Sequence, residues 1–379
     1  MLESTRMHFL DNLRAFVVLL VIALHGFMNY MAYASDCYVV DRQNSIFFTL
    51  LVLLIDVPIM PIMFFIAGYF ALPSLRKSGG RVFLREKLMR LGIPWAIAVL
   101  VLAPPIAYMT YLSRDVPMGL FEFWRTDFWT EMYEQSVYWF LGILLFMFLV
   151  LGFVYSLSGR LRAAPQRVSI PSWKTFVSFA AVMSAGFLLP NLWRSMDDWM
   201  DVYYLFVFQP VRLPVYIGYF VLGLYAYQHA WFTADGYQPR PGCWGLGCIL
   251  FGLAYLGFRG WSLSIEEPLL LVGAGTGILF NAFCLASLIA GVAVFQQKIN
   301  GAGFFWKSQA ANSYGIYYLH PLVLDPLAYA LRNVSLSVFL KAVLLVSLTI
   351  VMSWGLSALV LKKVHLLPGI SAPRPAIGR

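Results

Sequence analysis

The chain has 379 residues, of which 60% are hydrophobic and only 12% are charged, and its mean hydropathy is +0.74. Apolar runs of about 20 residues recur along it, which excludes a soluble domain, because such runs need lipid as their solvent. The runs are continuous rather than alternating, which excludes a membrane β-barrel. The net charge of +9 does not indicate nucleic-acid binding, since the basic residues cluster in short loops.

The apolar runs predict an all-α fold, a polytopic transmembrane bundle of about ten helices. We expect a single membrane-embedded domain over residues 1–365 and a short cytoplasmic tail over residues 366–379. The predicted spans cover residues 10–33, 46–73, 91–112, 138–157, 175–190, 203–228, 244–259, 268–294, 311–331 and 336–361.

The loops between these spans alternate in charge. Residues 74–90 contain six Lys or Arg and one Glu, whereas residues 114–137 contain five Asp or Glu and two Arg. Basic loops stay in the cytoplasm, so both termini are predicted to be cytoplasmic. The acidic loop is also rich in Trp, Phe and Tyr. This composition favours an aromatic belt at the membrane interface over a re-entrant helix that lines a glycan groove.

The first span carries Asp11, Arg14 and His25 in an otherwise apolar helix. Eleven residues at about 100° each place Arg14 and His25 on one helix face, and the rise between them is about 16 Å. Asp11 lies three residues before Arg14, the spacing at which such side chains meet. Ionisable residues inside a membrane usually mark a working site, so we interpret this stripe as functional. The alternative is an interfacial ion pair and a packing histidine.

Other polar residues are also predicted at membrane depth, namely Asp56, Arg212 and His320. An imidazole titrates near neutral pH, which makes His25 the best candidate for a general base. Asp56 is predicted at a similar depth and is a candidate to orient His25, as the carboxylate does in a hydrolase triad.

The basic segment Arg81–Trp95 is a candidate binding site for a phosphorylated donor. Arginine suits bidentate phosphate contacts, and we assign donor binding to Arg14, Arg81, Arg85, Lys87 and Arg90. The alternative is ordinary positive charge at the cytoplasmic surface, which also holds anionic lipid. The sequence contains no phosphate-binding glycine loop and no serine nucleophile elbow. The four cysteines show no metal-ligand or redox spacing, so neither a metal site nor a disulfide framework is expected.

Five segments, taken together and in order, resemble the acyltransferase family 3 membrane proteins, whose hallmark is an Arg followed after ten residues by a His. Here these residues are Arg14 and His25, and the resemblance extends over the whole chain. The family's usual serine before the Gly-Tyr pair is replaced by Ala67. The segments are FLDNLRAFVVLLVIALHG at 9–26, FFIAGYF at 64–70, REKLMRLGIPW at 85–95, WFLGILL at 139–145 and SYGIYYLHPLVL at 313–324.

The resemblance implies an O-acyltransferase of the bacterial cytoplasmic (inner) membrane. It would move an acyl group from cytoplasmic acyl-CoA to a hydroxyl of a periplasmic or cell-surface glycan or a related acceptor. The acyl-CoA would be either acetyl-CoA or succinyl-CoA. Within the family the chain looks most like the glucan biosynthesis protein C type, which is associated with succinylation of periplasmic glucans. The resemblance further implies that His25 and Arg14 are essential.

On this basis we expect Tyr317, Tyr318 and His320 to line the same cavity as His25 and to donate to the developing oxyanion. No permanently bound cofactor is expected. The expected partners are acyl-CoA, the glycan acceptor and membrane lipid. Two alternatives stay open: a glycan or lipid transporter or flippase that uses Arg14, His25 and Asp325 as a path, and a membrane scaffold or sensor.

Overall fold

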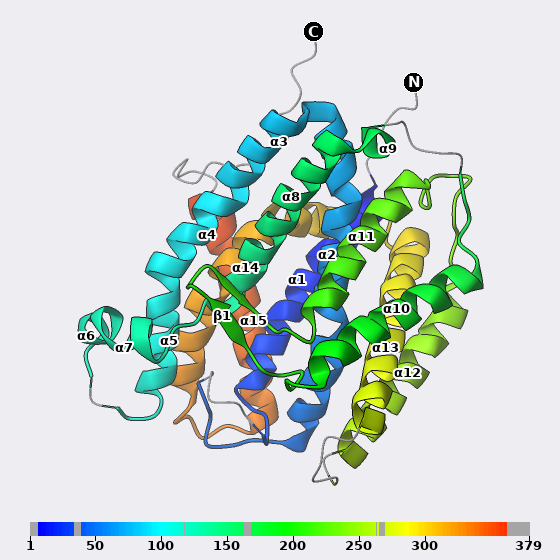
Figure 1. Ribbon diagram of the computed structural model, residues 1–379. Helices are drawn as coiled ribbons and strands as arrows, with labels where there is room; N and C mark the ends of the chain where they lie inside the picture. The colour runs from blue at the N-terminus through cyan, green and yellow to red at the C-terminus, as the bar shows by residue number, and fades with distance from the viewer. Residues whose placement is uncertain are drawn as a thin grey trace.

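The computed structural model describes residues 7–33, 39–116, 118–162, 168–262, 264 and 270–361. Long helices pack side by side in a bundle, with one short β-hairpin (Figure 1). The helices and strands are α1 (His8–Met28), α2 (Ile46–Ser78), α3 (Gly80–Lys87), η1 (Leu88–Gly92), α4 (Ile93–Ile97), η2 (Ala98–Leu102), α5 (Ala103–Leu112), α6 (Leu120–Arg125), α7 (Asp127–Thr130), η3 (Ser136–Tyr138), α8 (Trp139–Leu157), α9 (Gly159–Arg162), α10 (Trp173–Asn191), β1 (Met200–Val202), β2 (Phe206–Phe208), α11 (Leu213–Gln228), α12 (Pro241–Ser262), α13 (Leu270–Lys298), α14 (Phe304–Leu331), α15 (Val338–Leu356) and η4 (Ser357–Leu361).

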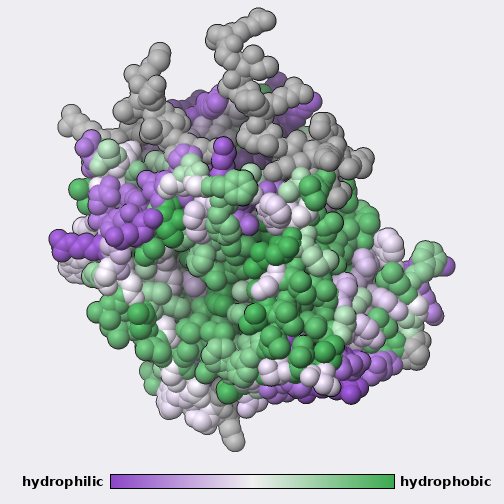
Figure 2. All heavy atoms as spheres, turned by 180° about the vertical axis from the view of Figure 1, so that it is seen from behind, coloured by the Kyte–Doolittle hydropathy of each residue, from purple (hydrophilic) through white to green (hydrophobic). Residues whose placement is uncertain are grey.

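The predicted all-α membrane bundle is confirmed. Within the described part of the chain, eight helices are long and apolar enough to cross a membrane. The two other predicted spans correspond to α11, which has only 16 residues, and to α14, which has 28 residues but many polar ones. Figure 2 shows hydrophobic side chains gathered in a broad band across one face, as a lipid-facing surface requires. The predicted tail over residues 366–379 lies outside the described residues.

Two predicted boundaries are wrong by about ten residues, and the others differ by fewer. The third span begins at Gly80 rather than at 91, because the basic segment assigned to a loop is itself helical and continues through η1 into α4. The sixth helix begins at Leu213 rather than at 203, because residues 200–208 form the antiparallel hairpin of β1 and β2. Pro214 follows at the first turn of α11, where a proline needs no hydrogen-bond partner.

Side-chain contacts identify one end of the bundle. The indole of Trp354 near the end of α15 donates to Ser308 near the start of α14 (2.9 Å), and Asn12 of α1 donates to the Ile299 carbonyl (2.7 Å). We call this end, where α1 and α14 begin and α15 ends, the terminal face. The opposite end, where α14 is followed by α15, is the distal face.

Helices α2 and α11 cross with their backbones in close approach. A Cβ atom on Gly68 would overlap the carbonyl oxygen of Phe220, and one on Gly223 would overlap the carbonyl oxygen of Phe65. Only glycine permits backbones to approach this closely, a device that membrane helices use because lipid does not drive them together.

Prolines free backbone carbonyls inside the bundle, and side chains of other helices use them. A proline lacks the N–H that would bond to the carbonyl four residues earlier. The carbonyl that Pro94 frees, on Arg90, accepts from the Tyr314 hydroxyl (3.1 Å). The carbonyl that Pro61 frees, on Val57, accepts from the Cys284 thiol (3.3 Å). These side chains give the freed carbonyls a hydrogen-bond partner inside the bundle, where no water is available to them.

Candidate active site

Two histidines from different helices meet inside the bundle. His25 lies in the last turn of α1 and His320 in the middle of α14, and their ring centroids are 5.3 Å apart with a tilt of 44°. His320 is fully buried, whereas His25 keeps partial exposure. The structure therefore brings together the two histidines that the sequence places at membrane depth.

Both rings have a defined tautomer. Nδ1 of His25 lies 2.7 Å from the Val21 carbonyl oxygen, and Nδ1 of His320 lies 2.7 Å from the Tyr317 carbonyl oxygen. A carbonyl only accepts, so each neutral ring carries its proton on Nδ1 and keeps the Nε2 lone pair. Nε2 of His320 is buried and has no hydrogen-bond partner within the part of the chain that the structure describes. The pair therefore presents two potential bases.

The sequence explains how the His320 ring is held. Pro321 follows directly and lacks the N–H that would bond to the Tyr317 carbonyl four residues earlier. The His320 ring donates to that freed carbonyl instead. The His-Pro dipeptide thus fixes both the orientation and the tautomer of the imidazole.

Asp56 on α2 is close enough to His25 to interact with it electrostatically, but it does not orient the ring by a hydrogen bond, since Nδ1 is bonded to Val21. Its carboxylate instead pairs with Arg212 (2.5 Å). Arg212 is 4% exposed and also pairs with Asp197 (2.8 Å). Two carboxylates neutralise the guanidinium, which leaves it no net charge for the carboxylate of an acyl group.

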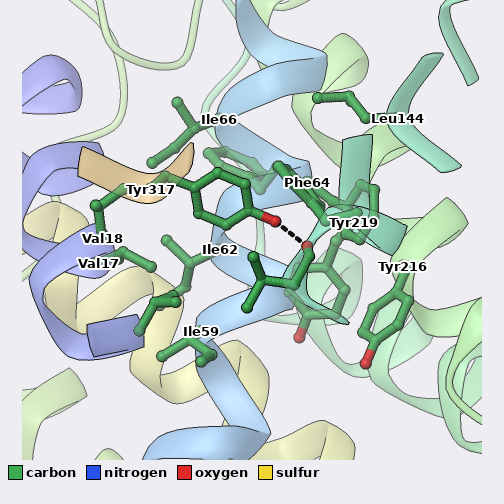
Figure 3. Close-up of a cluster of buried hydrophobic side chains, with 14 of the residues drawn as sticks. Val17, Val18, Ile59, Ile62, Phe64, Ile66, Leu144, Tyr216, Tyr219 and Tyr317 are labelled. Atoms are coloured by element: carbon green, nitrogen blue, oxygen red, sulfur yellow. Dashed lines mark hydrogen bonds between the residues drawn. The ribbon is translucent and has the colours of Figure 1, made fainter. Parts of the chain in front are cut away.

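Tyr317 lies beside His320, with 6.0 Å between the ring centroids, whereas the ring of Tyr318 packs against Tyr138; the hydroxyls of both tyrosines are already used. The Tyr317 hydroxyl donates to the Val137 carbonyl, and Figure 3 shows this bond within a cluster of apolar side chains from α1 and α2. The Tyr318 hydroxyl donates to the Pro94 carbonyl (3.0 Å). Either tyrosine would have to give up a bond between helices in order to donate to an oxyanion.

Arg14 and Asp11 form the pair that their spacing predicts, with 3.1 Å between Nη2 and the carboxylate. They lie toward the terminal face, about 16 Å along α1 from His25 by helical rise. The pair therefore does not belong to the immediate surroundings of the two histidines. Nε of Arg14 is buried without a hydrogen-bond partner in the described residues.

The basic residues assigned to donor binding separate into two groups. Arg81, Arg85 and Arg90 are exposed near the terminal face. Lys87 instead packs its ammonium over the rings of Phe83 (5.1 Å) and Phe148 (4.4 Å), so it is turned toward α8.

Sequence reasoning missed Glu134, which lies between α7 and η3 and interacts electrostatically with Asp325 of α14. Burial raises the pKa of Glu134 from its ordinary value of 4.5 to about 7. It also missed the pairing of Arg212 with Asp197. These partners belong to separate segments, and nothing in the local sequence indicates that they meet. Among the described residues, no group of three or more His, Cys, Asp or Glu side chains is placed to hold a metal ion.

Comparisons with known proteins identify the family of the chain. A family model described as "Acyltransferase domain", of the acyltransferase 3 family, matches residues 7–358. Relatives named "Glucans biosynthesis protein C", from Salmonella agona (strain SL483), Salmonella typhi and Salmonella heidelberg (strain SL476), are 25% identical over 266 residues. The match covers 67% of this chain and 66% of each relative, so the chain spans slightly less than two thirds of their length.

No solved structure matches the chain. The family model, in contrast, covers nearly all of it, including both histidines and the Arg14–Asp11 pair. The apolar helices and the match together identify a multi-pass membrane protein. The chain therefore belongs to the acyltransferase 3 family.

Proposed function

We propose that the protein transfers an acyl group, acetyl or succinyl, from acyl-CoA at the cytoplasmic face to a hydroxyl of a glycan on the other side of a bacterial cytoplasmic membrane. The observation that carries this proposal is that His25 and His320 meet inside the bundle, each with an Nε2 lone pair that forms no hydrogen bond to the backbone. Membership of the acyltransferase 3 family and the names of the relatives support the type of reaction.

In the mechanism that we favour, Nε2 of His25 takes the proton of the acceptor hydroxyl as the oxygen attacks the thioester carbonyl. The C–O bond forms, the C–S bond breaks, and the CoA thiolate receives the proton from the imidazolium. Asp56 stabilises the transient positive charge on His25 from a distance, since it lies near the ring without bonding to it. His320 provides a second base in contact with the same space.

The two faces suit the two substrates. Arg81, Arg85 and Arg90 are exposed near the terminal face, where an anionic donor would arrive. The distal face carries a cluster of aromatic side chains. The ring centroids of Tyr204 and Tyr133 are 4.8 Å apart, and the Tyr204 hydroxyl donates to the Trp129 carbonyl (2.9 Å). Flat aromatic rings beside carboxylates suit the apolar faces and hydroxyls of sugars.

The test compares wild type with His25→Ala in membrane vesicles at matched amounts of folded protein. Acetyl-CoA or succinyl-CoA is supplied with a glycan fraction, and CoA release and glycan mass are followed. We expect glycan-dependent CoA release from wild type and a loss of about 10²–10⁴-fold in the variant, the usual contribution of a general base. His229→Ala is the matched control, because His229 lies outside the bundle core at the end of α11.

Equal activity in wild type and His25→Ala would refute the assignment of His25. Glycan or lipid movement that proceeds without CoA would favour the transporter reading instead. Rapid quenching followed by mass spectrometry of the peptide that contains His25 distinguishes direct transfer from a relay, because only the relay accumulates an acyl-imidazole.

A further inference from the structure

A polar pocket of about 410 Å³ opens on the distal face, away from the two histidines. It lies between the segment that follows α1 and the turn that joins α14 to α15. The polar side chains of its wall include Arg42, Gln43, Arg332, Ser335, Ser337 and Lys341. Three of these six are cationic, although the loop over residues 114–137, which is predicted on the same side of the membrane, is mainly acidic.

Among the described residues, the charge balance of the pocket is positive. Lys341 is 1% exposed and donates to both carboxylate oxygens of Asp41 (2.8 and 3.0 Å), so these two charges cancel. Asp115 lies 3.7 Å from Arg332 and is 82% exposed on its side chain, which makes it a weak partner. Arg42 is exposed and forms no hydrogen bond or ion pair with any described residue. Two guanidinium groups therefore remain to attract an anion.

Unused hydrogen-bond donors point to the same ligand. Nε of Arg332 is buried and has no partner among the described residues, a state that costs free energy unless a ligand or water accepts from it. The pocket also contains the start of α15, where the Ser337 hydroxyl accepts from the Leu340 amide (3.3 Å). The remaining first-turn amides and the helix dipole favour negative charge there.

We propose that this pocket binds a phosphate or carboxylate group through Arg42 and Arg332. The group belongs either to an acidic substituent of the acceptor or to the head group of an anionic phospholipid, since both present the same oxygens to arginine. Hydrogen bonds through Asn29 link the edge of the pocket to the helical turn that carries His25. The side-chain amide of Asn29 donates to the His25 carbonyl (2.8 Å), and the backbone carbonyl of Asn29 accepts from the Asp41 amide (3.2 Å). A bound acceptor would thus be held beside the distal end of α1.

The first experiment measures binding without turnover, so its result is independent of the proposed acyl transfer. The thermal unfolding midpoint of the purified full chain in detergent is compared in inorganic phosphate and in chloride at equal ionic strength. Phosphate should raise the wild-type midpoint by about 2–4 °C, and the double variant Arg42→Gln, Arg332→Gln should lose this rise. Arg240→Gln is the matched control, because Arg240 is an exposed arginine on the terminal face.

An equal rise in wild type and in the double variant would overturn the proposal. If the double variant does not fold, Arg42→Gln alone decides, because Arg42 is exposed and unpaired among the described residues. The source is then separated in nanodiscs. A stabilisation by phosphatidylglycerol that depends on the arginines assigns the pocket to a lipid head group. If phosphatidylglycerol does not stabilise the protein, the KM for an acidic acceptor is compared between wild type and the double variant. A higher KM in the double variant, with kcat unchanged, assigns the pocket to the acceptor.

Discussion

The position of one proline determines how the buried His320 ring is fixed. Pro321 removes a helical N–H, and the carbonyl of Tyr317 is thereby free to accept from the ring of the preceding residue. His25 makes the same type of bond to Val21, four residues earlier in an uninterrupted helix. At His320 the arrangement therefore depends on a residue that itself makes no polar contact with the site.

Pro321→Ala tests this dependence. The new N–H competes for the Tyr317 carbonyl, so the ring loses its fixed orientation. We expect kcat for acyl transfer to fall by about tenfold or more, while the thermal midpoint stays equal or rises, because alanine suits a helix interior better than proline. The control is Pro326→Ala, on the same helix but not adjacent to the ring. Unchanged kcat in Pro321→Ala would refute the positioning role.

The sequence was sufficient for contacts along one helix and insufficient for contacts between helices. The Asp11–Arg14 pair follows from a spacing of three residues, and it is present. The approach of His25 to His320 joins residues that lie almost 300 positions apart, and no pattern within either helix encodes it. For the same reason Arg212 was recognised as a polar residue at membrane depth, while neither Asp56 nor Asp197 was predicted to pair with it.

At the level of helices, the crossing of α2 and α11 is the tightest contact described above. Its two glycines face backbone atoms rather than side chains, so a neighbouring residue cannot rotate away to make space. An added methyl group must therefore separate the helices themselves. That separation would also disturb the Asp56–Arg212 pair, which joins the same two helices at their distal ends.

Gly223→Ala should accordingly destabilise the protein by at least about 1–3 kcal/mol, the usual cost of overpacking. A thermal midpoint lowered by several degrees in detergent is the expected result. Gly257→Ala on α12 provides the comparison, because a Cβ atom there meets nothing within 4 Å. Equal midpoints for the two variants would show that the crossing relaxes without cost.

At the scale of the whole molecule, hydropathy was sufficient to predict the helices, and their order along the chain follows directly. It could not predict which helices are neighbours, since lipid tails are as apolar as the packed side chains and leave no amphipathic pattern. The hairpin of β1 and β2 was also missed, because the apolar strand β2 resembles an N-terminal extension of α11. The orientation in the membrane rests on loop charge alone and stays a prediction.

Orientation is testable by labelling single cysteines in a variant whose native cysteines are replaced. Glu131→Cys places the thiol on the distal face and Arg85→Cys places it near the terminal face, and both native side chains are exposed. With a membrane-impermeant maleimide on intact spheroplasts, we expect position 131 to react and position 85 to react only after permeabilisation. The reverse pattern would place Arg81, Arg85 and Arg90, the arginines proposed to bind the donor, outside and would contradict the proposed direction of transfer.

The separate attachment of the two histidine rings has a consequence for motion. Each imidazole is bonded to a carbonyl of its own helix, so each ring moves with its helix, and no hydrogen bond joins one ring to the other. A small sliding of α1 along α14, of the kind that packed helices perform, translates directly into a change in the distance between the rings. Proton sharing between two bases depends steeply on that distance. The rate of the proposed acyl transfer would then vary with these small movements of the helices, even if every side chain of the site kept its rotamer.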